Sequence, residues 1–121
     1  MDDEDYIRDL LSDMLQILNY EVMLTDDGYE AIEQYRIAKL SGKPFDAVIM
    51  DLVVPGSIGG KESIDRLIEL DPNINVIVSS GYSDDPIMAN FREYGFVDVL
   101  PKPYKLEELS RVLNKIFLPS I

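Results

Sequence analysis

Residues Phe45–Leu52 read FDAVIMDL, a nearly continuous apolar run that ends beside an aspartate. A parallel strand buried by helices on both faces has this composition, because neither face meets water. A second run of this kind lies in INVIVSSGY, Ile74–Tyr82, and a shorter one in FVDVLPKPY, Phe96–Tyr104. The three runs predict an α/β fold with a parallel sheet covered by helices on both sides.

Helical patterns alternate with these runs. Apolar residues recur at three- and four-residue spacings in Asp5–Asn19, and a second pattern follows the turn at Asp27-Gly28. Another helix is expected from Lys61 to Leu70. Two more are predicted, one after Asp84 or Asp85 with Pro86 in its first turn and Gly95 past its end, and one on Leu106, Leu109, Val112, Leu113 and Ile116.

The segment YEVMLTD, Tyr20–Asp26, is short and rich in β-prone residues, and it predicts one more strand. The order of elements then begins with a helix within a few residues of Met1, whereas an α/β layer of this kind normally begins with a strand. The opening strand is therefore expected to be largely missing from this sequence.

Composition fits a single soluble domain over residues 1–121. The chain is 46% hydrophobic and 28% charged, without an apolar run long enough to span a membrane or a signal-peptide pattern, so a cytoplasmic domain without membrane contact is expected. The absence of histidine and cysteine excludes imidazole bases, thiol chemistry and disulfides. The formal net charge of −12 argues against nucleic-acid binding, because phosphate neutralisation needs clustered Lys and Arg.

Polar residues stand at the carboxyl ends of the predicted strands, where ligands collect in open parallel sheets. Asp51 ends AVIMD, Ser79 and Ser80 end VIVSS, Lys102 follows DVLP, and Asp2 and Asp3 precede the first helix. Converging carboxylates repel one another unless a cation separates them, and Mg²⁺ or Mn²⁺ prefers such ligands. Asp51 could then be a nucleophile that forms an aspartyl phosphate, with Lys102 and Ser80 neutralising the phosphoryl group.

Each of these residues also has a simpler explanation when taken alone. Asp51 could cap a strand, Asp2 and Asp3 could belong to a solvated acidic terminus, and Ser80 and Lys102 could serve loop geometry. These explanations would have to apply independently at four strand ends, which favours one common site.

Taken together, the motifs resemble the receiver domain of two-component response regulators over essentially the whole chain. They are DDE before the first helix, FDAVIMD with a proline four residues on, VIVSSG and LPKP, in that order. The stretches DLVVPGSIGGKES, VSSGYSDDP and VLPKPY are most similar to receivers attached to hybrid sensor histidine kinases. The resemblance implies a flavodoxin-like, doubly wound parallel sheet of strand order 2-1-3-4-5.

The resemblance also implies roles for individual residues. Asp51 would accept a phosphoryl group, in a Mg²⁺-dependent reaction, from a histidine kinase or a histidine phosphotransfer domain. Asp3 would ligate the metal directly and Asp2 mostly through water, with Asp51 and the backbone carbonyl of Val53 completing the protein ligands. Ser80 would move onto the phosphoryl group and Lys102 would pair with it, and a cis peptide is expected between Lys102 and Pro103. Such a domain is a conformational signalling switch that slowly loses its phosphate, and is not a classical enzyme.

The sequence departs from the family pattern in three places. Val99 takes the position of an aromatic ring that often swings inward with the switch hydroxyl, so the signal is expected to pass through loop backbone shifts, using Tyr82 or Tyr104 at the surface. Ser80 replaces the commoner Thr, and the loop VPGSIGGKE is one residue longer than usual.

In the expected strand order, the missing strand is a central one, and its loss would leave buried backbone groups unpaired. About four to six apolar residues are therefore expected before Met1 in the native domain. A strand swapped from a second copy, giving a homodimer, is the alternative. An intact mass of 13.8 kDa from a well-folded monomer would contradict the first expectation.

Two other functions remain open. A degenerate receiver would serve only as a protein-interaction module. An aspartyl-phosphate phosphatase or phosphomutase is less favoured, because these enzymes tend to carry a second acid two residues after the nucleophile, where this chain has Val53.

Overall fold

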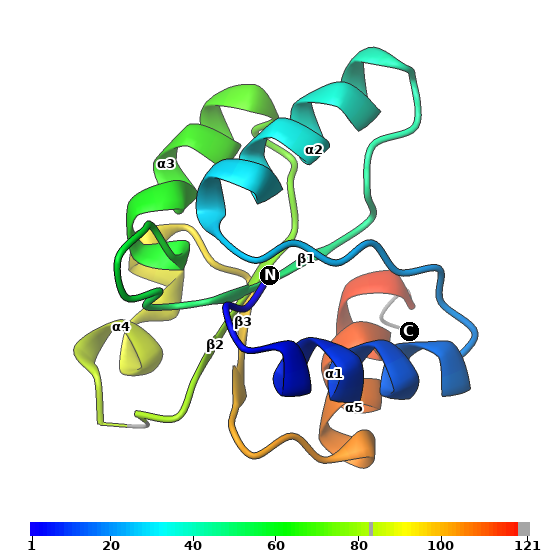
Figure 1. The fold of residues 1–121 in the computed structure, drawn as a ribbon, viewed down its shortest axis with the longest axis vertical. Helices are drawn as coiled ribbons and strands as arrows, with labels where there is room; N and C mark the ends of the chain where they lie inside the picture. The colour runs from blue at the N-terminus through cyan, green and yellow to red at the C-terminus, as the bar shows by residue number, and fades with distance from the viewer. Residues whose placement is uncertain (83, 119–121) are drawn as a thin grey trace.

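The computed structural model describes residues 1–82 and 84–118, which place helices on both faces of a small parallel sheet (Figure 1). In chain order the elements are α1 (Asp5–Ile17), α2 (Gly28–Leu40), β1 (Val48–Asp51), α3 (Gly60–Leu70), β2 (Val76–Ser80), α4 (Pro86–Ala89), a 3-10 helix (Phe91–Tyr94), β3 (Asp98–Pro101) and α5 (Leu106–Phe117). No helix within these described ranges is long and apolar enough to cross a membrane.

The three apolar runs form the sheet, as predicted. β1 pairs with β2, and β2 with β3, both in parallel. Val48 lies opposite Val76, and Ile77 lies opposite Asp98. This register brings the carboxyl ends of all three strands to the same edge of the sheet, where the candidate site residues stand.

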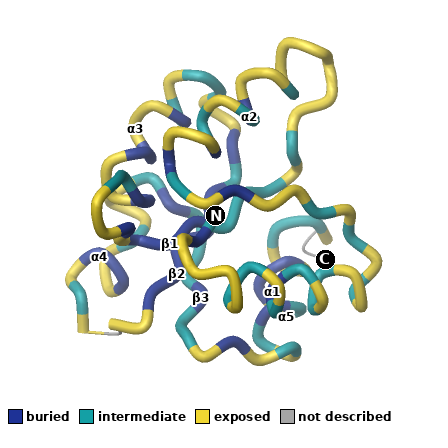
Figure 2. The backbone as a smooth tube through the Cα atoms, viewed as in Figure 1, coloured by how far each residue is buried: buried dark blue, intermediate teal, exposed yellow. Residues whose placement is uncertain are grey.

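The sheet separates two hydrophobic cores, because successive strand residues point to opposite faces. Met50 and Val78 belong to the core beneath α2 and α3, whereas Ile77 belongs to the core beneath α1 and α5. Buried residues concentrate where the helices meet the sheet (Figure 2). The helix residues buried in these cores are Ala31, Tyr35, Ile64 and Leu67 on the first face, with Ile87 and Met88 of α4, and Leu11, Leu109, Val112 and Leu113 on the second.

The predicted helices form, with one interruption. Asp85 caps α4 by accepting a hydrogen bond from the Ile87 N–H, and Pro86 occupies its first turn. The helix stops at Ala89, and the chain continues as a 3-10 helix that ends at Gly95, with φ of 101°. The predicted single helix is therefore two short pieces, joined where the backbone N–H and the side-chain amide of Asn90 both donate to the Pro86 carbonyl.

The strand predicted at Tyr20–Asp26 is not formed, and the expected five-strand order 2-1-3-4-5 is reduced to a three-strand sheet. A strand needs a neighbour to complete its ladder of hydrogen bonds. Among residues 1–82 and 84–118, this segment has the short piece Met1–Asp2 beside it, through a hydrogen bond from the Asp2 N–H to the Thr25 carbonyl. The prediction of a strand was wrong: one hydrogen bond to this piece does not make a ladder.

Met1 and Asp2 occupy the sheet position between the Tyr20–Asp26 segment and β1. The Asp51 N–H donates to the Met1 carbonyl, and the amino group of Met1 donates to the Ile49 carbonyl at 2.7 Å. Beyond Met1 lies a groove of about 560 Å³, lined by Leu15, Asn19, Tyr20, Glu21, Val22, Met23, Lys43, Pro44, Phe45, Asp46, Ala47, Ile49, Leu113 and Phe117. Asp46 and Ala47, just before β1, and Ile49 within it line one side of the groove, where the expected first strand would run.

Candidate functional site

The sheet brings the predicted site residues to one edge. Asp51 is the last residue of β1, Ser80 is the last residue of β2, and Lys102 directly follows β3. Asp2 reaches the same place from the N-terminus, because Met1 pairs with β1 just below it. Asp2, Asp51 and Ser80 are buried, whereas Asp3 is exposed at the surface of the site.

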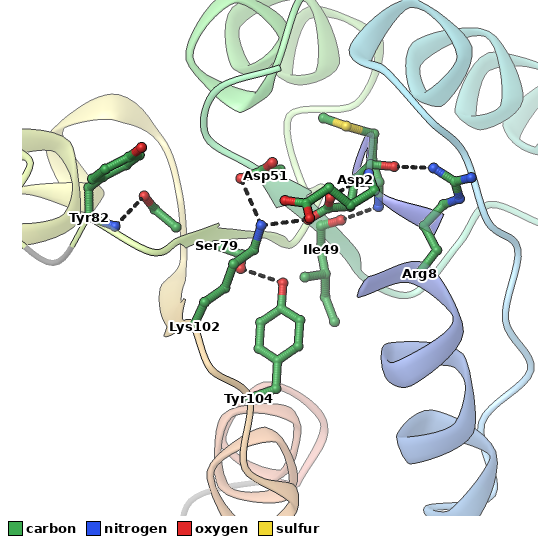
Figure 3. A network of polar contacts seen from close by, with 11 residues as sticks. Asp2, Arg8, Ile49, Asp51, Ser79, Tyr82, Lys102 and Tyr104 are labelled. Atoms are coloured by element: carbon green, nitrogen blue, oxygen red, sulfur yellow. Dashed lines mark hydrogen bonds and ion pairs between the residues drawn. The ribbon is translucent and has the colours of Figure 1, made fainter. Parts of the chain in front are cut away.

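The ammonium group of Lys102 lies between two carboxylates (Figure 3). Lys102 Nζ is 2.7 Å from Asp2 Oδ2 and 3.4 Å from Asp51 Oδ1. Burial acts to lower the pKa of Lys102, but the ion pair with Asp2 and the charge of Asp51 outweigh it, so the pKa lies above its ordinary value. Lys102 therefore stays charged and holds the two acids together.

Asp51 is the acid with the most perturbed carboxyl. Burial raises the pKa of Asp51 to about 6, against the opposing effect of the Lys102 ammonium, and the nearby charges of Asp2 and Asp3 raise it further. A nearby cation stabilises the ionised form of a buried carboxyl group such as this one. Asp51 is therefore ionised at neutral pH, in surroundings that favour binding of a further positive charge.

Asp2 is held firmly through its other groups. Its Oδ1 accepts a hydrogen bond from the Glu4 N–H at 3.0 Å, and its carbonyl accepts one from Arg8 at 2.7 Å. Its Oδ2 is buried and, among the described residues, has the Lys102 ion pair but no well-directed hydrogen bond. A buried carboxylate oxygen left in this way is suited to a metal ion.

The acids at the N-terminus form a cluster that could hold a divalent cation. Asp2, Asp3 and Glu4 each offer a carboxylate oxygen, and the three atoms lie within 4.8 Å of one another. The structure thus brings the predicted pair Asp2 and Asp3 together, and it adds Glu4, which the sequence analysis did not single out. Asp51 is not a member of that cluster, although the charge of Asp3 reaches it. An all-oxygen donor set of this kind fits Mg²⁺ or Mn²⁺.

Val53, whose carbonyl was predicted as a further ligand, lies two residues beyond the end of β1, and its side chain is half-exposed. The loop that follows is tied to the start of α2. Ser57 donates a hydrogen bond to Asp27 at 2.9 Å, and the Gly28 N–H donates to the Ile58 carbonyl at 2.7 Å. These bonds fix the chain that follows Asp51.

Ser80 and its neighbour Ser79 have different partners. Ser80 Oγ accepts a hydrogen bond from the Tyr82 N–H at 3.0 Å, which leaves the hydroxyl proton of Ser80 available to another acceptor. Ser79 Oγ lies 2.5 Å from the Tyr104 hydroxyl. The expectation that Tyr104 is a surface residue was wrong, since it is buried, whereas Tyr82 is exposed as expected. The predicted cis peptide between Lys102 and Pro103 is present.

Sequence reasoning missed two nitrogen-containing groups at this site. The amino group of Met1 is buried, which lowers its pKa to about 6. Arg8 hydrogen-bonds the Asp2 carbonyl and forms an ion pair with Asp5. The spacing of Arg8, one helical turn beyond Glu4, was the only signal in the sequence that could have suggested a contact with the N-terminal acids.

A family model, that of the response regulator receiver domain, matches residues 1–114. The chain is 29% identical over 117 residues to the chemotaxis protein CheY of Thermotoga maritima, covering 96% of this chain and 92% of that protein. It is also 30% identical over 116 residues to the sensor kinase CckA of Brucella abortus, which covers 96% of this chain but only 12% of CckA.

A similar solved structure is the receiver domain of a sensor histidine kinase of Pseudomonas aeruginosa, described with a magnesium ion coordinated in its active site cleft. The TM-score is 0.81 at 24% identity, over 95% of this chain and 91% of that chain. At this identity the likeness shows a common fold. The three strands and five helices described here are thus part of a receiver fold.

Proposed function

Since this chain belongs to the response regulator receiver domain family, we propose that it accepts a phosphoryl group on Asp51 and signals through the resulting change of conformation. The observation that carries the proposal is the position of the Lys102 ammonium, shared between the buried carboxylates of Asp2 and Asp51. The donor is the phosphohistidine of a histidine kinase or a histidine phosphotransfer domain. Residues 1–121 act as one receiver domain in this reaction.

The chemistry follows from the ionised carboxylate of Asp51. One of its oxygens attacks the phosphorus, an O–P bond forms, the N–P bond to the donor imidazole breaks, and its electron pair stays on the nitrogen. Lys102 neutralises charge on the transferred group, and Ser80 donates its hydroxyl proton to a phosphoryl oxygen. Asp2 and Asp3, with Asp51 and the Val53 carbonyl, would hold Mg²⁺, which supplies further positive charge when bound.

Switching requires that phosphorylation favours one of two conformations. Ser80 and Lys102 bind the phosphoryl group in only one of them, so they bias the equilibrium. The similarity to part of CckA and to the receiver of a sensor histidine kinase supports a finer proposal, that this receiver works with or within a hybrid kinase.

Acetyl phosphate with MgCl₂ tests the proposal without a cognate kinase. We expect one adduct of about 80 Da on the wild-type protein, none on the Asp51→Asn variant, and full labelling of an Asp98→Asn control that lies outside the site. Rapid turnover of acetyl phosphate without an accumulating adduct would instead indicate a phosphatase. The absence of any adduct would indicate a degenerate receiver that acts only as an interaction module, and either result would overturn the proposal.

A further inference from the structure

A buried phenol hydroxyl lies next to the site, and the proposed chemistry does not use it. Tyr104 is 8% exposed, and its hydroxyl oxygen is 2.5 Å from Ser79 Oγ (Figure 3). Ser79 is completely buried in the middle strand of the sheet, opposite Asp51 on one side and Leu100 on the other. The pair therefore joins the segment after β3 to the centre of the sheet.

Packing alone does not require the hydroxyl groups of Tyr104 and Ser79. A phenylalanine would fill the space of the Tyr104 ring equally well, and an alanine would fill most of the space of Ser79. A buried hydroxyl is costly without a partner, and here each hydroxyl satisfies the other. Such a hydrogen bond fixes the direction of the Tyr104 side chain as well as its distance from Ser79, because the bond tolerates little change in angle.

The bond acts on the segment that carries Lys102. Two hydrogen bonds tie this segment to β2, one from the Lys102 N–H to the Ser80 carbonyl at 3.0 Å and one between Tyr104 and Ser79. The first fixes the backbone of Lys102. The second fixes the chain two residues later, so Lys102 is held on both sides.

Figure 3 shows the Tyr104 ring below the Lys102 side chain, with its hydroxyl directed toward the strand end and the ammonium group above it. The two groups are close enough for the Lys102 charge to act on the Tyr104 hydroxyl. A lysine side chain has several rotatable bonds and loses entropy when it is held in one place.

We propose that Tyr104, through its hydrogen bond to Ser79, is a positioning residue that holds the Lys102 ammonium where it reaches both Asp2 and Asp51. The inference rests on the proposed function, because it assigns Tyr104 a part in the same phosphoryl transfer. Tyr104 itself touches neither the donor nor Asp51. Its effect on the reaction passes entirely through Lys102.

The experiment measures the rate constant of phosphorylation by acetyl phosphate in Tyr104→Phe, Ser79→Ala and the double variant, each in the wild-type and in the Lys102→Ala background. Tyr94→Phe, a partly exposed tyrosine on the 3-10 helix, is the matched control. With Lys102 present, we expect each single substitution to slow the reaction about fivefold, and the double variant to be no slower than either, because both remove one hydrogen bond. In the Lys102→Ala background, Tyr104→Phe should cause no further loss.

Two kinetic results would overturn the inference. One is a rate for Tyr104→Phe within about 1.5-fold of the wild type, well below the effect of one hydrogen bond. The other is the same loss in both backgrounds, which a general structural role would produce. Thermal unfolding of each variant shows that the proteins compared are folded.

A second measurement separates this inference from the proposed function. If the wild-type protein forms no adduct, the proposed function fails, but the position of Lys102 can still be examined by NMR. We then expect the ammonium protons of Lys102 to exchange with water several-fold faster in Tyr104→Phe than in the wild type, and Tyr94→Phe to leave the rate unchanged. Equal exchange rates in wild type and Tyr104→Phe would contradict the inference.

Discussion

Asp51 has a buried carboxyl group whose protonation affects stability and, on the proposed function, would also affect metal binding. Burial raises the pKa of Asp51 to about 6, from an ordinary value of 3.8. Between these values the metal-free folded protein keeps a proton that the unfolded chain has released. The contribution of Asp51 to the free energy of unfolding therefore declines as pH rises from about 4 through 6, and its full destabilisation is present above about pH 6.

We predict that Mg²⁺ binding weakens below pH 6, because the proton and the metal compete for Asp51. Calorimetric titration with MgCl₂ should show an apparent Kd that rises up to about tenfold for each pH unit between pH 6 and pH 5. In metal-free protein, Asp51→Asn should remove the decline in stability between pH 4 and 6, whereas Asp9→Asn, an exposed control on α1, should keep it.

The amino group of Met1 affects the free energy of unfolding in a different pH range. Its pKa is lowered from 8.0 to about 6, so its contribution to stability is lost as pH falls from 8 to 6. This effect should remain in Asp51→Asn, which separates the two groups. An apparent Kd for Mg²⁺ that is equal at pH 5 and pH 7.5 would contradict the predicted role of Asp51.

The strand-end residues were predictable because each one ends or directly follows an apolar run. Asp51, Ser80 and Lys102 lie together as their places in the sequence predicted. The burial of Tyr104 was not predictable in this way. Its partner Ser79 is 25 residues away, and only the folded chain shows that the two hydroxyls meet.

At the scale of elements, the continuous apolar runs predicted strands correctly, whereas the short β-prone segment Tyr20–Asp26 did not. A buried strand such as β2 is specified by its own composition, since every residue in it is buried. Tyr20–Asp26 depends on a neighbouring strand for its hydrogen bonds, and with little to pair with it does not form one. The predicted helix divides at Asn90, whose backbone N–H and side-chain amide both donate to the Pro86 carbonyl, and periodicity does not reveal this division.

The junction of β1, its loop and α3 leaves no room for a side chain at Gly59. A Cβ there would lie 2.6 Å from the Leu52 carbonyl oxygen and 2.9 Å from that of Asp51. We predict that Gly59→Ala shifts the loop beside Asp51, lowers the free energy of unfolding by about 2 kcal/mol, and slows phosphorylation. Chemical denaturation and acetyl phosphate labelling measure the two effects.

Gly60 is the matched control for this junction. A Cβ at Gly60 would lie 3.4 Å from the Asp51 carbonyl oxygen, and the residue begins a helix in which alanine is favoured. Gly60→Ala should therefore change stability by less than about 1 kcal/mol. Equal losses in the two variants would show that the close approach at Gly59 is not the cause.

For the whole molecule, the family and the α/β architecture follow from the order of four motifs along the chain. The number of strands in the sheet does not follow from these motifs, because each strand needs hydrogen-bonding neighbours that lie elsewhere in the sequence. The groove beyond Met1 marks the place where this sheet is incomplete, beside the free edge of β1. The expectation of a preceding strand remains a prediction.

We predict that about four apolar residues fused before Met1 will enter this groove as a strand parallel to β1. Pairing with β1 and with Val22–Leu24 would bury apolar surface and satisfy backbone groups, so the thermal midpoint should rise by several degrees, about 4–8 °C per kcal/mol for a domain of this size. Mg²⁺ should bind more tightly, because Asp2 and Asp3 would be held by a longer strand.

An extension of equal length with two central prolines is the control, since proline cannot complete the ladder. It should leave both the thermal midpoint and the Mg²⁺ affinity unchanged. If the apolar and the proline-containing extensions have the same effect, the groove does not accept a strand.

The division of the molecule into two cores has a practical consequence for engineering. Because the sheet separates the α2 and α3 layer from the α1 and α5 layer, the outer surfaces of the two layers can be redesigned independently. The choice of partner could thus be changed by replacing the exposed residues of one layer with those of another receiver. The opposite layer and the residues at the strand ends would stay the same. The two layers thus offer two separate outer surfaces on either side of the same strand-end residues.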